Sequence, residues 1–407
     1  MDVIREEATA AISALPQVER DAAHFMSKNG TKWYKDYKLN KPGPSKNMIY
    51  DPLSIFRCLL SEDIFRIIIR ETNRKANQVA STWNQEHSTK QKQWKALTLK
   101  EFDAFVAIIL YAGLTKSNTE PAKELWDSTH APIFKAALSH DRFLSITKLI
   151  RFDNAYTRPQ RLQTSKTAAI DDIWLMLQAN LRGAYTPHSS LTVDEQLFPY
   201  RGRTRFTHYI PSKSAKYGIK VWWLCDSKYF YPLKGMIYGG KVPGRKREIN
   251  QGQKIVLDLV GNYLGVGRTV YADNFFSTLE VATLLMAQKT AFVVTVRANK
   301  TFIPPEFLRS PARPVLSSLF GFHNGNVSLC SYVPKKNKSV ILLSTMYYTS
   351  EVDNLNKQKP MAILDYNSHK SGVDTMDQML IHANVRQIVG HLQYSTTWLI
   401  FLHWLPS

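Results

Sequence analysis

The stretch Ser190-Leu191-Thr192-Val193-Asp194-Glu195-Gln196-Leu197 marks the point at which the residue pattern of this chain changes. From residue 51 to about residue 183, apolar side chains recur with the spacing of helices. Beyond residue 190 they form short runs rich in Val, Ile, Trp and Tyr, bounded by Gly, Pro or Asp, which is typical of strands. These runs lie at residues 191–193, 219–225, 269–272 and 291–296. Residues 255–260 and 277–288 have helical patterns, so we predict an α+β fold with a mixed sheet and packed helices.

The region before the change contains a well-defined helix signal. Thr98 and Glu101 form a capping box, and Gly113 is placed to end the helix. Between them, apolar residues stand at positions 102, 105, 106, 109 and 110, on one helical face. Ser61, Ser139 and Asp171 are predicted to open further helices, which makes this block all-α.

A Pro-rich stretch after residue 300 separates a third region from the mixed sheet. Short strand-like pieces follow at residues 327–333 and 340–343, and a further strand is predicted at residues 362–366. At the other end of the chain, an acidic helix over the first 25 residues leads into a lysine-rich linker that closes near residue 46. We therefore expect one insertion after residue 300 and one linker before the helical block.

Composition limits the classes of partner. The 407 residues carry a formal charge of +20, which favours a polyanion such as nucleic acid. No apolar run approaches the roughly 20 residues that a membrane-spanning helix requires, so no membrane partner is expected. Cys58, Cys225 and Cys330 are isolated, which argues against disulfides and against a cysteine-based zinc site.

The positive charge is concentrated between residues 200 and 255, where thirteen Lys and Arg face two acids, a net charge of +11. We predict that this basic band contacts DNA phosphates, although a solvated surface would have a similar composition. The residues predicted to bind DNA are Arg201, Arg203, Arg205, Lys213, Lys216, Lys220, Arg245, Lys246 and Arg247.

Four acids stand at positions where strands end or helices begin. Asp194 follows the run at residues 191–193, Asp273 ends the run at residues 269–272, and Asp374 is followed by Asp377 at helical spacing. Carboxylates brought to one edge of a sheet supply the hard oxygen ligands that Mg²⁺ prefers. Two such ions would support an in-line phosphoryl displacement. The alternative is that each Asp caps a turn, and for any single Asp that alternative is favoured.

Four motifs in a fixed order favour the metal-site interpretation of these acids over turn capping. They are Val193-Asp194-Glu195-Gln196-Leu197 with Arg201-Gly202-Arg203; Pro211-Ser212-Lys213 through Lys216-Tyr217-Gly218-Ile219-Lys220 to Cys225-Asp226-Ser227; Ala272-Asp273-Asn274-Phe275-Phe276-Ser277; and Asp365-Tyr366-Asn367 with Gly372-Val373-Asp374 and Asp377-Gln378. Together they resemble the piggyBac transposase family, including proteins derived from such transposable elements, over about residues 51–380.

The resemblance implies an RNase H-like catalytic domain with a DDE/D-type site. Asp194, Asp273 and Asp374 would be the catalytic acids that bind Mg²⁺ or Mn²⁺, and Asp377 would be a fourth acid of the site. The reaction implied is cut-and-paste transposition at TTAA targets, which consists of phosphoryl transfers on double-stranded DNA at transposon ends. A nuclear location and a homodimer are implied as well.

The resemblance also divides the chain into domains. Residues 1–45 form the acidic helix and basic linker, 46–189 the first part of a helical dimerisation and DNA-binding domain, 190–299 the first part of the catalytic domain, 300–360 a small β-rich insertion domain, 361–383 the second part of the catalytic domain, and 384–407 an altered remnant of the helical domain.

Two departures from the family pattern shape the expected activity. Ser371-Gly372 replaces the usual glycine pair before the third acid, and the chain after Leu380 no longer resembles the family's closing helices or its cysteine-rich zinc domain. A truncated or altered C-terminus is therefore expected to impair excision of paired ends. A domesticated, non-catalytic, sequence-specific DNA-binding protein is the alternative function, and a decaying genomic copy is a third possibility.

Overall fold

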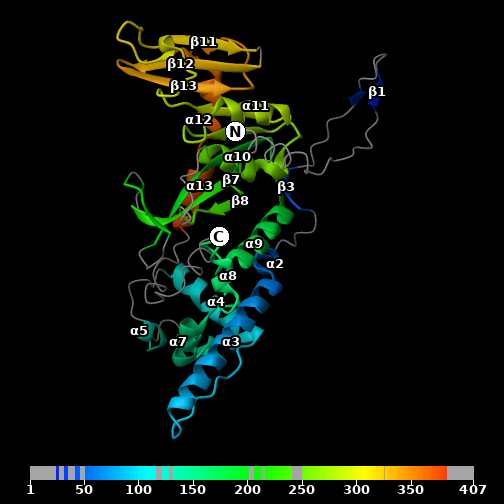
Figure 1. Ribbon diagram of the computed structural model, residues 1–407, viewed down its shortest axis with the longest axis vertical. Coiled ribbons are helices and arrows are strands. Elements are labelled where there is room, and N and C mark those ends of the chain that lie inside the picture. Colours follow the sequence, from blue (N-terminus) through cyan, green and yellow to red (C-terminus); the bar gives the residue numbers. More distant parts are fainter. Residues whose placement is uncertain are drawn as a thin grey trace.

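The computed structural model describes residues 24–26, 32–34, 42–45, 51–115, 122–127, 132–200, 206–211, 213, 216–240, 250–324 and 326–382. The helix predicted over the first 25 residues and the remnant predicted at 384–407 lie almost wholly outside these residues. Figure 1 shows an elongated molecule, with a helical block at one end and a sheet that extends from the middle to the other end. No helix in the described part of the chain is long and apolar enough to cross a membrane.

The helical block spans residues 51–184. Its helices are α2 (Pro52–Leu59), α3 (Glu62–Glu86), α4 (Leu99–Leu114), α5 (Ala122–Asp127), α6 (Pro132–Ala137), α7 (His140–Leu149), α8 (Arg158–Arg161) and α9 (Asp171–Ala184). The predicted capping box is confirmed at the start of α4, where the Thr98 hydroxyl accepts the Glu101 backbone N–H at 3.2 Å and the Glu101 carboxylate accepts the Thr98 N–H at 3.3 Å. Behind this cap, Phe102, Phe105 and Ile109 are completely buried.

The central element is a mixed nine-stranded sheet. In chain order its strands are β5 (Ser190–Pro199), β6 (Thr207–Tyr209), β7 (Tyr217–Asp226), β8 (Pro232–Ile237), β9 (Thr269–Ala272), β10 (Ala291–Thr295), β11 (Ser318–His323), β12 (Val327–Lys335) and β13 (Lys338–Ser344). In space the order is β11-β12-β13-β10-β9-β5-β7-β6, and β8 also pairs with β7. The pairs β5·β9 and β9·β10 are parallel, and the other pairs are antiparallel.

Helices cover both faces of this sheet. Leu191 and Val193 of β5 share one apolar core with α10 (Gln251–Val260) and α11 (Leu279–Ala287). The opposite face packs against α12 (Met361–His369), α13 (Gly372–His382) and the helical block. On that face the rings of Trp174 and Trp223 meet edge-on, with centroids 5.4 Å apart. Gly235 makes room for this contact, because a Cβ there would lie 2.4 Å from the Trp223 ring.

Short elements complete the described chain. The strand pairs are β1 (His24–Met26) with β2 (Lys32–Tyr34), β3 (Gly43–Pro44) with β4 (Tyr185–Thr186), and β14 (Val352–Asp353) with β15 (Lys359–Pro360). Two 3₁₀ turns stand at Gly261–Tyr263 and Pro305–Phe307. Residues 300–360, predicted as an insertion, are continuous with the main sheet because β13 pairs with β10.

Two local predictions were wrong. Residues 362–366 lie in α12 and not in a strand, because Ala362, Ile363 and Tyr366 together bury one helical face against Tyr271 and its neighbours on the sheet. The strand predicted to end at residue 193 continues to Pro199, so Asp194 lies within β5 rather than after it. Pairing with β7 continues through all of these residues and holds the acid in extended backbone.

The cap of α4 gives a direct test of the helical block. Replacing Thr98 with Ala removes the hydroxyl that accepts the Glu101 N–H, and should lower the free energy of unfolding by about 1 kcal/mol. Urea unfolding followed by circular dichroism measures this loss. Thr98→Ser keeps the hydroxyl and serves as the matched control, so equal stability of both variants would contradict the capping role.

Candidate active site

Asp194 and Asp273 stand at the same level of two neighbouring parallel strands. The last aligned pair between β5 and β9 is Val193 with Ala272, and each Asp is the next residue along its own strand. Adjacent strands lie about 4.8 Å apart, and residues at matching positions point to the same face. The sheet therefore brings together two acids that are 79 positions apart in the sequence.

Asp374 is brought to these acids by α13, which packs along β5. At the start of the helix, Gly372 lies so close to the sheet that a Cβ would stand 2.6 Å from the Thr192 hydroxyl. One turn beyond Asp374, the Asp377 carboxylate accepts a hydrogen bond from the Gln196 side-chain amide at 2.7 Å. Thr192, Asp194 and Gln196 share one face of β5, because side chains alternate along a strand. The two anchor points therefore place Asp374 over Asp194.

The pKa of Asp194 responds to the charges of the other two acids. Burial raises the pKa of Asp194 to about 7; the neighbouring charges of Asp273 and Asp374 add to this, whereas the Glu195 N–H and Lys213 oppose it. Burial also raises the pKa of Asp273. Like charges held together in a buried site favour either protonation or a bound cation.

Tyr366 of α12 belongs to the same environment. Burial raises the pKa of its phenol to about 12, and the charges of Asp273, Asp194 and Asp374 contribute to the shift. The hydroxyl is therefore protonated at neutral pH and can donate a hydrogen bond. The influence of these acids on Tyr366 could not be anticipated from the sequence, because a strand was predicted at residues 362–366.

Each carboxylate at present has a local partner. Asp194 accepts the Glu195 N–H at 2.7 Å, and Asp273 accepts the Phe275 N–H at 2.8 Å. Asp374 lies 3.7 Å from the Lys213 ammonium and its side chain is 56% exposed. Within the described residues, no three His, Cys, Asp or Glu side chains are grouped so that they could hold a metal ion. The donors have the hard-oxygen chemistry that suits Mg²⁺ or Mn²⁺, but a shared ion would require their side chains to turn away from these partners.

The fourth acid, Asp377, is held by a buried relay. The Trp223 indole N–H donates to the Gln196 side-chain carbonyl at 3.0 Å, which fixes the amide orientation, so that the amide nitrogen donates to Asp377. Gln196 is only 1% exposed. This side chain joins β7, β5 and α13, and so positions the helix that carries Asp374. Sequence reasoning quoted Gln196 within a motif but assigned it no role.

Comparison with known proteins agrees with this geometry. The family model described as Transposase IS4, a DDE-type model of piggyBac-type transposases, matches residues 51–403. The chain belongs to the piggyBac-type transposase family. The match continues beyond Leu380, where the resemblance was expected to stop, so the later residues also follow the family pattern.

A solved structure supports the same assignment. The chain is similar to the piggyBac transposase in a cryo-EM structure of its synaptic complex with hairpin DNA, with a TM-score of 0.78 and 30% sequence identity. The alignment covers 90% of this chain and 76% of that one. The mixed sheet with its helices therefore has an RNase H-like architecture, as predicted.

The basic band of this transposase-family chain is described only in part. Arg201, Arg203, Arg205, Arg245, Lys246 and Arg247 lie outside the described residues. Lys213 donates to the Glu195 carbonyl at 3.2 Å as well as facing Asp374, and Lys220 pairs with the Glu195 carboxylate at 2.5 Å. Lys216 lies in an exposed turn with a positive φ of 53°. Among the residues predicted to bind DNA, three lysines are described. Two of them, Lys213 and Lys220, lie beside acids and offset negative charge near the site.

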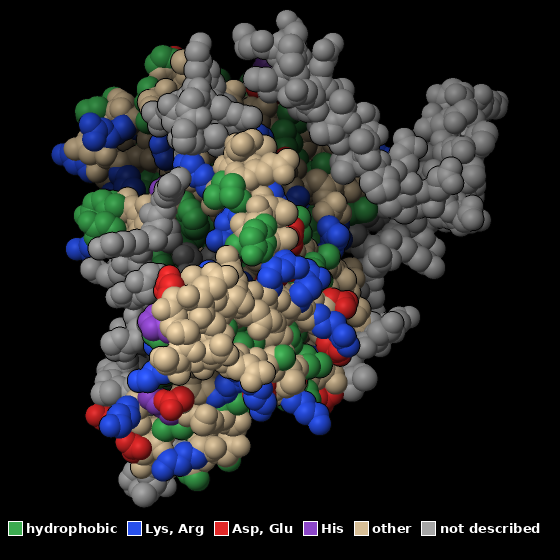
Figure 2. Space-filling model, turned by 60° about the horizontal axis from the view of Figure 1, so that its bottom comes forward, with side chains coloured by type: hydrophobic (Ala, Val, Ile, Leu, Met, Phe, Trp, Pro, Cys, Tyr) green, Lys and Arg blue, Asp and Glu red, His purple; other side chains and the backbone are tan. Residues whose placement is uncertain are grey.

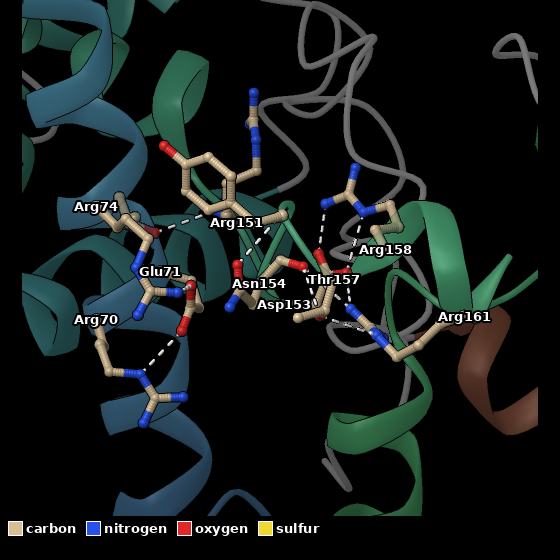
Figure 3. A network of polar contacts seen from close by, with 11 residues as sticks. Arg70, Glu71, Arg74, Arg151, Asp153, Asn154, Thr157, Arg158 and Arg161 are labelled. Carbon is tan, nitrogen blue, oxygen red and sulfur yellow. Dashed lines mark hydrogen bonds and ion pairs between the residues drawn. The ribbon is translucent and has the colours of Figure 1, made fainter.

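A second basic group lies in the helical block and was missed by sequence reasoning. Figure 3 shows two carboxylates, Glu71 and Asp153, each held between two arginines. Glu71 is paired with Arg70 at 2.8 Å and with Arg74. Asp153 is paired with Arg161 at 2.5 Å and with Arg158, whose Nε donates to it at 3.0 Å. We call the residues Arg70, Arg74, Arg151, Arg158 and Arg161 the arginine cluster.

The arginine cluster carries more positive charge than its two acids can neutralise. Both carboxylates are almost fully buried, at 3% and 2% exposure, whereas the Arg70 side chain is 64% exposed. Buried carboxylates hold the guanidinium groups in place, and the excess charge faces outward. On the face that Figure 2 presents, Lys and Arg side chains are spread widely, several of them beside acids. The short spacing of Arg70 and Arg74 around Glu71 was a signal available in the sequence.

The Gln196 relay can be tested by substitution. Gln196→Leu leaves the Asp377 carboxylate and the Trp223 N–H without this partner, and should lower the free energy of unfolding by about 1–3 kcal/mol. Gln196→Glu instead places a second carboxylate against Asp377, which raises the pKa of that carboxyl pair. The Gln196→Glu variant should be most stable at low pH, where the carboxyl pair is protonated, and should lose stability as the pH rises through the raised pKa.

Thermal unfolding between pH 5.5 and pH 8 separates these outcomes. The unfolding temperature of Gln196→Glu should fall relative to wild type as the pH increases, whereas the deficit of Gln196→Leu should not change with pH. A pH-independent deficit in both variants would mean that Gln196 fills space without orienting Asp377.

Proposed function

We propose that this chain catalyses divalent-metal-dependent cleavage and joining of double-stranded DNA at transposon ends, with TTAA as the target sequence. The observation that supports the proposal is that Asp194 and Asp273 follow an aligned pair on neighbouring parallel strands, and that the charges of Asp273 and Asp374 both act on the pKa of Asp194. The match to a transposase in a complex with hairpin DNA supports the substrate class. Mg²⁺ or Mn²⁺ is the proposed cofactor, the nucleus the proposed location, and a homodimer the proposed assembly.

The three acids differ in how firmly the fold holds them. Asp194 and Asp273 are fixed by paired strands, whereas Asp374 stands on the first turn of a helix with an exposed side chain. When bound, a divalent ion would polarise the phosphoryl group and activate the attacking oxygen. Lys213 neutralises part of the acidic charge while no phosphate is present, and can move to a DNA phosphate because its ammonium stands 3.7 Å from Asp374.

Non-catalytic DNA binding is the second candidate, and one observation favours it. The Lys213 ammonium lies 3.7 Å from the Asp374 carboxylate, where a metal ion would otherwise be needed to offset the acid. A protein that retained DNA binding but lost cleavage would keep the basic residues and tolerate such an arrangement. The two candidates therefore differ in whether the acids are needed for chemistry.

Replacement of the three acids discriminates between these functions. Asp194→Asn, Asp273→Asn and Asp374→Asn should each reduce Mg²⁺- or Mn²⁺-dependent nicking of a transposon-end duplex by at least about 100-fold, because each removes a charged ligand while keeping the side-chain shape. Asp141→Asn is the control, since that side chain is 99% exposed and lies on α7, away from the sheet. Absence of nicking in the wild type, with DNA binding intact in all variants, would support the second candidate.

We propose that the arginine cluster contacts DNA phosphates. The salt dependence of the DNA-binding constant tests this. Arg70→Gln with Arg151→Gln removes two charges while Arg74 still pairs with Glu71 and both Arg158 and Arg161 still pair with Asp153. If both contact phosphates, the slope of log K against log salt should fall in magnitude by about 1.8, at about 0.9 for each contact. Fluorescence anisotropy with a labelled duplex measures the slope.

The control for this measurement removes the same charge elsewhere. Arg309→Gln with Lys338→Gln changes two exposed residues at the far end of the sheet. The slope of this control should equal that of the wild type. If the Arg70 and Arg151 variant also keeps the wild-type slope, the arginine cluster is a structural feature of the helical block.

A further inference from the structure

A polar cavity lies on the face of the sheet that α12 and α13 cover, at the end of β5 opposite to the acids. It forms where β5 begins, where β7 ends and where α12 is joined to α13, and its volume is about 490 Å³. Its lining residues are His188, Ser189, Ser190, Ser227, Lys228, Phe230, Ser368, His369 and Ser371. A volume of this size is typical of small-ligand sites.

The lining has the chemistry of an anion site. Five serines, two histidines and one lysine line it, and none of these described lining residues is an acid. The Ser368 hydroxyl is already used, since it donates to the Asp365 backbone carbonyl at 2.8 Å. Lys228 is exposed and supplies a permanent positive charge. The cavity also adjoins Ser371, just before the first turn of α13, where the positive end of the helix dipole adds to the attraction for an anion.

The first histidine is held by a buried carboxylate. The Nδ1 atom of His188 lies 2.9 Å from Asp226, whose side chain is completely buried. Asp226 also accepts the His188 backbone N–H at 2.7 Å and the Tyr185 hydroxyl at 3.1 Å. The ring of Tyr229 lies 5.1 Å from the imidazole. Asp226 therefore fixes the orientation of the imidazole.

The second histidine also lies beside a carboxylate, although its Nδ1 atom is 2.9 Å from the Asp365 backbone carbonyl as well. The Nδ1 atom of His369 lies 3.1 Å from the Asp365 carboxylate. Its ring stacks on Tyr271 at 4.6 Å, and the Tyr271 hydroxyl donates to the other Asp365 oxygen at 2.7 Å. Lys370 follows directly in the chain and is the remaining nearby charge on this helix. In both histidines Nδ1 faces a carboxylate, so Nε2 is the ring nitrogen that each can offer to a ligand.

From this pairing we propose that the cavity is an oxyanion site that binds a tetrahedral phosphate group between His188, His369 and Lys228. A transition-metal site is disfavoured, because two imidazoles without a carboxylate in the lining fall short of the usual ligand number and the Lys228 ammonium would repel a cation. The phosphate can come from a DNA strand or from a free phosphate or nucleotide, and both present the same oxygens.

The site is separate from the catalytic acids. Ser190 precedes Asp194 by four residues on the same strand, which corresponds to about 13 Å. The proposal therefore does not rest on cleavage activity and would survive its absence. The cavity is connected to the catalytic acids through the junction of α12 and α13, which precedes Asp374. Ser368, His369 and Ser371 belong to this junction and also line the cavity.

Sulfate is the probe for the first experiment, because it is tetrahedral and its charge is constant between pH 5.5 and pH 8. Isothermal titration of the full chain at pH 6 should detect sulfate binding. His188→Gln with His369→Gln should weaken this binding by about tenfold or more. Lys228→Gln, an exposed change that should not disturb folding, should weaken the binding as well because it removes a positive charge.

The control is His323→Gln, which changes an exposed histidine on β11 and should bind sulfate like the wild type. Competition identifies the source of the phosphate. Displacement of sulfate by a short DNA duplex assigns the site to the DNA backbone. Displacement by a nucleoside monophosphate but not by the duplex assigns it to a free ligand. Failure of the wild type to bind sulfate at millimolar concentration would overturn the proposal. Unchanged binding in both the double-histidine and Lys228 variants would overturn it as well.

Discussion

The close contact between α13 and β5 is the constraint on which the rest of the site depends. Gly372 approaches the Thr192 hydroxyl more closely than any side chain would permit, and the Gln196–Asp377 hydrogen bond fixes the same helix one turn further on. These two anchors determine where Asp374 lies relative to the strands. A helix held by only one of them could rotate or slide, and the third acid would move with it.

This arrangement concentrates negative charge, and the protein offsets it locally. Burial and neighbouring carboxylates raise the pKa of Asp194 to about 7, so the site is costly to ionise fully without a cation. Lys213 and Lys220 reduce that cost by facing Asp374 and Glu195. Both lysines were expected to contact DNA, and their pairing with acids shows why a basic stretch of sequence does not by itself define a binding surface.

The helical block also contains buried carboxylates whose charge must be neutralised. Glu71 and Asp153 are buried, and each is stabilised by two arginines, because an unpaired buried carboxylate would be strongly destabilising. The same pairing orders guanidinium groups that would otherwise be mobile. Charge excess and rigidity together are what a surface needs to recognise phosphates at low entropic cost.

The sequence determined the features that depend on neighbouring residues. The cap of α4 is local, since Thr98 and Glu101 are three residues apart, and the apolar runs of β7, β9 and β10 required no distant partner to be recognised. The acids and their motifs were visible as residue types in a fixed order, which was enough to indicate the family. The helix α12 was misassigned because its apolar positions fit either period, and only packing against Tyr271 and Val293 selects the helix.

Tertiary structure decided everything that joins distant segments. The sequence could not show that β5 continues through Asp194, because that depends on pairing with β7. The arginine cluster joins residues about 80 positions apart, and the polar cavity joins His188 with His369. The acids could be named from the sequence, but only the strand register and the contact of α13 with Thr192 and Gln196 bring them to the same side of the sheet. Local patterns specify elements, whereas a site made from several elements exists only once their packing fixes the distances.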